Sequence, residues 1–140
     1  MNILLNLNQV NPDYIFYGEI TKNSIIENGM FTRIIYSDSL MTLNGLHITF
    51  HQHEYGIGYN ENDKIIQKGI IETLIELERI ILFKIDITEK TCQYKIKDYL
   101  KNLSSKLGDN FKVNKYLLKI SGIWETTNEY GITFKFLDMK

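Results

Sequence analysis

The alternation of apolar and polar residues changes its period twice along the chain, from two to 3.6 and back to two. Strand-forming residues concentrate in four early runs, at 1–7, 14–20, 30–36 and 46–51. Asn28-Gly29 and Asn44-Gly45 are two-residue turn signals. The first third therefore predicts strands joined by two hairpins.

The middle of the chain has a helical period. Apolar residues recur at helical spacing at Ile70, Ile71, Leu74, Ile75, Leu77, Ile81 and Leu82. A second apolar stripe comprises Ile96, Tyr99, Leu100, Leu103 and Leu107. Gly108 is placed to end it. We expect two helices here, the first of about five turns.

Strand patterns return at 113–125 and 130–137, and no repeat or linker divides the 140 residues. A β-rich part, two helices and a C-terminal hairpin predict a single domain, residues 1–140, of the α+β class. We expect an antiparallel sheet. The sequence leaves open whether this sheet closes into a barrel-like (OB-like) form.

Composition bears on the source and the compartment. The chain has no alanine but 22 isoleucines, 14 lysines and 13 asparagines, the residues of AT-rich codons, which suggests a low-GC microbe or a large DNA virus. Cys92 is the single cysteine, so we expect a reducing compartment. With no signal-peptide pattern and no long apolar run, we expect an intracellular protein without a membrane partner.

Charge divides the chain into an acidic and a basic part. Residues 1–83 hold five Lys/Arg and ten Asp/Glu, whereas residues 84–140 hold eleven and seven, within a net charge of -1. A polyanion is therefore expected to meet the second half.

No motif of catalysis or cofactor binding is present. Cys92 has no histidine nearby in sequence and is expected at a helix start, and Gly56-Ile57-Gly58 lacks the rest of a phosphate loop. His47, His51 and His53 alternate on one strand face, which is a possible metal geometry. We expect them to be metal-free and exposed to solvent, because Leu46, Ile48 and Phe50 occupy the core side. The protein is expected to be no enzyme and to need no cofactor.

The C-terminal hairpin presents two faces. Alternation groups Trp124 with Leu118 and Ile120, and Phe134 with Phe136, so we expect these aromatics in the core. The opposite face, with Lys119 and Lys135, is then available to a phosphate backbone. The candidate nucleic-acid-binding residues are Lys95, Lys97, Lys101, Lys112, Lys115, Lys119 and Lys135, with Tyr94, Tyr116 and Tyr130 as stacking rings.

The segment SGIWETTNEYGITFKF, preceded by a lysine-rich helix, resembles the C-terminal hairpin of small proteins of nucleocytoplasmic large DNA viruses. Some of those are thought to be OB-like single-stranded-DNA-binding proteins. The resemblance covers about sixteen of the 140 residues. It implies a replication or virion-associated role, in the host cytoplasm, a virus factory or the virion.

Two functions follow as hypotheses. The first is a non-enzymatic protein that binds single-stranded nucleic acid, DNA or RNA, weakly and with little sequence preference. The alternative is a structural or virion-associated protein that binds other proteins or further copies of itself, in which the lysines only form a solvated surface.

Overall fold

The fold is one sheet with two helices on it, seen in a computed structural model that describes residues 3–23, 25, 28–54, 61–105 and 112–139. The helices are α1 (Glu61–Lys84) and α2 (Lys95–Ser105), and two 3-10 turns are η1 (Leu7–Gln9) and η2 (Pro12–Tyr14). The strands are β1 (Leu5–Asn6), β2 (Ile15–Asn23), β3 (Gly29–Ser37), β4 (Thr42–Asn44), β5 (Leu46–Glu54), β6 (Thr91–Gln93), β7 (Lys112–Glu125) and β8 (Glu129–Met139). The predicted α+β class is confirmed.

Strand β7 organises the sheet. Its first part pairs with β5 (Leu46↔Ile120) and its last part with β3 (Phe31↔Trp124), while β8 pairs along its other side. The prediction of a purely antiparallel sheet is wrong, because β1 runs parallel to β5 and β6 runs parallel to β8. The described strands also form an open sheet and no barrel, since β1 and β2 lie at its two ends and do not pair with each other.

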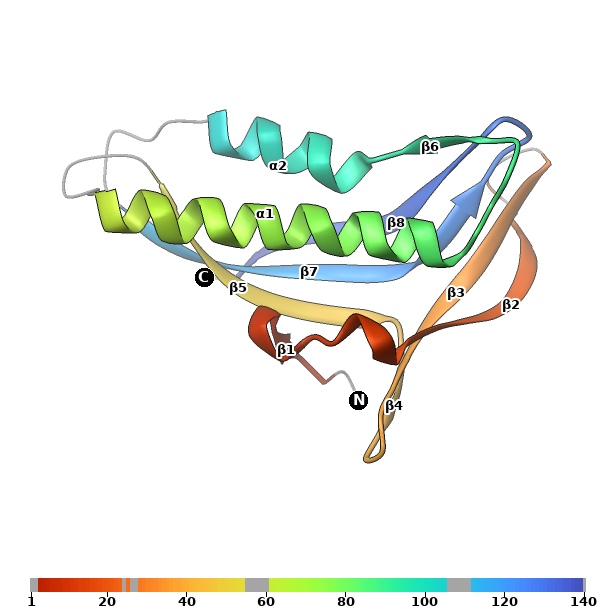
Figure 1. Ribbon diagram of the computed structural model, residues 1–140, viewed down its shortest axis with the longest axis horizontal. Coiled ribbons are helices and arrows are strands. Elements are labelled where there is room, and N and C mark those ends of the chain that lie inside the picture. The colour runs from red at the N-terminus through yellow and green to blue at the C-terminus, as the bar shows by residue number, and fades with distance from the viewer. Residues whose placement is uncertain (1–2, 24, 26–27, 55–60, 106–111, 140) are drawn as a thin grey trace.

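The core lies between the sheet and the helices. Figure 1 shows α1 and α2 side by side over one face of the sheet. Leu46, Ile48 and Phe50 are buried on this face, as the period-two pattern predicted. Tyr99 of α2 stacks on Phe136 of β8, with ring centroids 4.5 Å apart. Phe136 therefore packs against the helices, also as predicted.

The two turn predictions are only partly right. A hairpin joins β2 to β3 as predicted, but Gly29 pairs with Asn23 and belongs to β3, so Asn28-Gly29 is not a two-residue turn, and Asn28 precedes the strand with a positive φ of 56°. The next reversal lies at Asp38, whose backbone N–H donates to the carbonyl of Met41 at 3.0 Å. Gly45, with a φ of +82°, instead bends the chain from β4 into β5. A positive φ thus occurs both at Asn28, where the chain enters β3 of the hairpin, and at Gly45, where it bends into β5.

The helix predictions are confirmed with changed bounds. Helix α1 begins at Glu61, earlier than Ile70, the first residue of the periodic pattern. The proposed end of the second helix at Gly108 lies outside the described residues. Cys92 lies in strand β6 and not at a helix start, because residues 91–93 pair with β8. Neither helix in the described part of the chain is long and apolar enough to cross a membrane.

Candidate functional site

The sheet face opposite the helices, called the outer face below, carries the candidate site. Residues paired across neighbouring strands share a face. Lys119 is paired with Lys135 on β8 and alternates with the buried Leu118 and Ile120, so both lysines lie on the outer face. The sequence prediction that these two lysines lie opposite the core is confirmed.

A β-bulge places Trp124 on the same face. The register of β7 and β8 shifts between Ile120 and Gly122, which leaves one extra residue, Ser121, on β7. Ile120 and Ile123 both point to the core, with 1% and 0% of their surface exposed. Trp124 therefore faces outward, and the prediction that it shares a face with Leu118 and Ile120 is wrong. The physical reason is that one inserted residue inverts every later side chain of a strand.

Two aromatic rings cover glycines on the outer face. A Cβ built on Gly122 would lie 2.6 Å from the Phe31 ring, and one built on Gly131 would lie 2.8 Å from the Trp124 ring. Both rings are half-buried, so part of each stays accessible to solvent. Phe16 lies on this face too, because it pairs with Ile35 while its neighbour Ile15 is buried, and it is 51% exposed. The outer face thus combines cations with accessible aromatic surface.

The basic side chains of the outer face form a row across three strands, called the cationic row below. Lys119 stands directly opposite Lys135 on one side and His47 on the other. Lys115 lies four residues earlier on β7, on the same face. None of these three lysines forms an ion pair or hydrogen bond with any described residue. Their charges are therefore uncompensated by a neighbouring carboxylate.

The environment of His47 reflects this row. Burial, followed by the charge of Lys119, lowers the pKa of His47 below its usual value of 6.5. The imidazole is half-buried and not fully exposed as predicted. His51 and His53 follow on β5, but their side chains lie outside the described part of the chain. Among the described residues no three His, Cys, Asp or Glu side chains come together as a metal site.

The other predicted lysines do not join the cationic row. Lys95, Lys97 and Lys101 lie on α2, over the opposite face of the sheet. Lys95 reaches a shallow hollow at the β8 edge that Trp124 and Thr133 also line. The Lys112 side chain is outside the described part. The structure therefore splits the predicted basic surface into two sides.

Two of the three predicted stacking tyrosines are unsuitable. Tyr116 and Tyr130 are each only 8% exposed, and Tyr116 stacks on Phe50 at a centroid distance of 5.8 Å. Burial, with a hydrogen bond to Cys92, raises the pKa of Tyr130 to about 12. Tyr94 is 39% exposed but precedes α2, away from the outer face. The expectation that the rings of Tyr116 and Tyr130 are exposed for stacking is wrong, because both fill the core.

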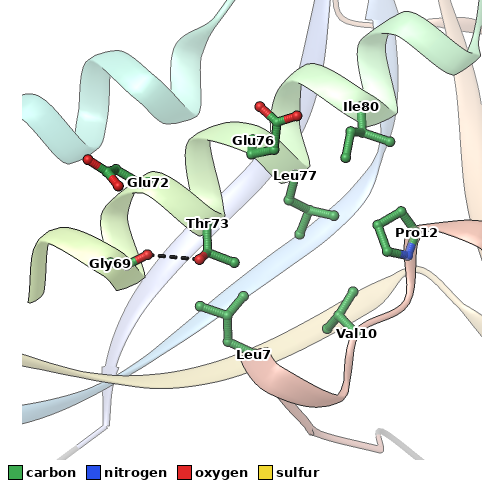
Figure 2. A pocket seen from close by; sticks show the side chains of 9 residues that line it. All are labelled: Leu7, Val10, Pro12, Gly69, Glu72, Thr73, Glu76, Leu77 and Ile80. Atoms are coloured by element: carbon green, nitrogen blue, oxygen red, sulfur yellow. Dashed lines mark hydrogen bonds between the residues drawn. The ribbon is translucent and has the colours of Figure 1, made fainter. Parts of the chain in front are cut away.

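A second hollow, of about 490 Å³, lies on the helix side of the molecule. Figure 2 shows Leu7, Val10 and Pro12 of the N-terminal segment facing Leu77 and Ile80 of α1. Two carboxylates stand at its rim, those of Glu72 and Glu76, and the second is held by Arg79. The carboxylates at the rim would repel a phosphate, and the apolar floor offers it no hydrogen-bond donor. This hollow is therefore not part of the candidate site.

Comparisons of the chain with protein-family models, with curated proteins and with solved structures gave no match. The resemblance of the C-terminal hairpin to proteins of large DNA viruses stays a prediction.

Proposed function

We propose that the outer face binds single-stranded nucleic acid, weakly and with little sequence preference, without catalysing a reaction. The supporting observation is the cationic row, in which Lys119 lies opposite both Lys135 and His47. Like charges directly opposite each other on a sheet are destabilising. A phosphate backbone laid across the row would relieve that repulsion.

The aromatic rings beside the row supply the second element of such a surface. Trp124 and Phe31 are cross-strand neighbours, and both present half-buried rings. Stacking of a base on one ring contributes about 1 to 3 kcal/mol and does not depend on the identity of the base. Cations for phosphates and rings for bases together support binding without base-specific hydrogen bonds.

The charge count sets the expected strength. Three to five neutralised phosphates give a log-log salt slope of about -2 to -3.5 for a single strand. The net charge of -1 and the acidic residues on α1 oppose a strong long-range attraction. We therefore expect a Kd in the micromolar range at low salt.

The test compares two double charge reversals of equal net change. Lys119→Glu with Lys135→Glu, on the outer face, is expected to weaken binding of a labelled oligonucleotide by at least about tenfold and to flatten the salt slope by about 1.4. Lys97→Glu with Lys101→Glu, on α2, is the matched control and should reduce affinity far less. Fluorescence anisotropy at several salt concentrations measures both quantities.

Two results would contradict the proposal. One is wild-type protein without salt-sensitive binding at low ionic strength, and the other is an equal loss in both double variants. The alternative, a structural or virion-associated protein that binds other proteins, would then be favoured.

A further inference from the structure

A hollow of about 340 Å³ opens on the outer face where four strands meet. It is lined by Phe31, Arg33, Asn44, Gly45, His47, Ile120 and Ser121. These residues come from β3, β4, the bend after β4, β5 and β7. The hollow therefore exists only in the assembled sheet.

Two backbone irregularities create this space. Gly45 adopts a positive φ and donates its backbone N–H to the carbonyl of Ile34 at 2.8 Å, which ends the pairing of β4 with β3. On the facing strand, Ser121 is the extra residue of the β7 bulge. A regular sheet would fill this position with paired strands, whereas here the two bends leave a gap between β3 and β5.

The side chains around the gap are donors and cations. Arg33 offers the planar guanidinium fork that matches phosphate oxygens, and Asn44 and Ser121 add an amide and a hydroxyl. Arg33 makes no hydrogen bond or ion pair with any described residue. Glu19 lines a neighbouring hollow together with Arg33, but the two side chains form no ion pair within 4.0 Å. No carboxylate lines this hollow itself.

The cationic row leads into this hollow. It runs from Lys135 on β8 through Lys119 on β7 to His47 on β5, and His47 is also a wall of the hollow. On the far side of β5 the neighbouring strand is β1, which pairs with β5 only at Ile48 and Thr49. No residue of β1 stands opposite His47, so the row ends there. A nucleic-acid strand bound along the cationic row would therefore bring its end to Arg33, beside the Phe31 ring.

We infer that this hollow binds a phosphate monoester, either the terminal phosphate of a nucleic-acid strand or the phosphate of a free nucleotide. The inference rests on the proposed function for the strand, but the free nucleotide tests it independently. A monoester carries close to two negative charges at neutral pH, against one for an internal diester. The guanidinium of Arg33 can hold two phosphate oxygens at once, and Lys119, which stands opposite His47, supplies a second positive charge beside the hollow.

The experiment uses oligonucleotides of one sequence with a 5′-phosphate, a 3′-phosphate or only hydroxyl ends. We expect one phosphorylated form to bind about tenfold more tightly than the hydroxyl form, the effect of one added charge-assisted hydrogen bond. Arg33→Gln should reduce this ratio to below about twofold, and Arg33→Lys, which keeps the charge without the fork, should leave an intermediate ratio. Arg79→Gln, on α1, is the control and should keep the full ratio.

A second arm separates the two sources of phosphate. Titration of a nucleoside monophosphate and of the matching nucleoside, followed by nuclear magnetic resonance, should show binding of the phosphate form alone, with Arg33→Gln abolishing it. If the monophosphate binds and no oligonucleotide does, the hollow is a nucleotide site and the proposed function fails. If all oligonucleotides bind equally and the monophosphate does not bind, the inference is wrong and the proposed function stands.

Discussion

Glu78→Ala is expected to lower the free energy of unfolding by about 3 kcal/mol. Glu78 lies on α1 with 0% of its surface exposed, and its carboxylate accepts hydrogen bonds from the backbone N–H groups of Ile96 and Lys97 at 2.8 and 2.9 Å. These are first-turn donors of α2, which have no partner within a helix. Alanine would leave the buried Ile96 N–H and the partly buried Lys97 N–H without this acceptor, and it would leave a cavity between the helices. Urea unfolding followed by circular dichroism measures the loss.

Glu78→Gln is the matched variant, because it keeps the shape and one acceptor but cannot ionise. Burial is the main cause that raises the pKa of Glu78 above 4.5, and the charge of Asp98 raises it further by a smaller amount. The two backbone hydrogen bonds and the charge of Lys97 lower the pKa but do not cancel the effect of burial. The folded protein therefore keeps Glu78 protonated at pH values at which the unfolded chain has already lost that proton. The contribution of Glu78 to the free energy of unfolding falls as the pH rises from 4.5 to the pKa of Glu78 in the folded protein. Glu78→Gln should lack that part of the pH dependence. Equal slopes in both proteins would contradict this account of the carboxylate.

Gly122→Ala is expected to destabilise the fold by about 3 kcal/mol, at the upper end of the usual cost of overpacking. A Cβ at this position would lie 2.2 Å from the carbonyl oxygen of Thr32, and this contact is with backbone on the neighbouring strand. Relief would require β3 to separate from β7, which would also displace Phe31 and Trp124. The unfolding midpoint measures the stability, and Trp124 fluorescence reports the changed environment of the ring.

Gly69→Ala provides the contrast for that substitution. Gly69 lies within α1, and a Cβ added there meets no atom within 4 Å. Alanine in a helix is favoured over glycine by about 0.8 to 1 kcal/mol, so this variant should be more stable than the wild type. Similar effects of the two substitutions, in sign and size, would show that the close contact at Gly122 does not govern its cost.

The sequence predicts one part of the candidate site and not the other. The period-two pattern was sufficient to place Lys119 and Lys135 together on the accessible face. The same pattern gives Tyr116 the parity of Leu118 and Ile120, so its burial was readable and the stacking role was an error of interpretation. In contrast, Arg33 and His47 come from the acidic first half, and no sequence pattern connects them with the C-terminal lysines.

The sequence by itself determined the helices, most strands and the side of β5 that is buried, because each depends on periodicity within one short segment. The tertiary structure alone decided which way Trp124 faces, where Glu78 finds its partners and how the sheet bends at Gly45. These features arise from contacts between segments far apart in the chain. The bulge at Ser121 lies where Gly122 packs against Phe31 and Thr32 of β3. The carboxylate of Glu78 contacts a helix that begins seventeen residues later. Local patterns carry no information on such contacts, since a single inserted residue inverts a strand face without changing its composition.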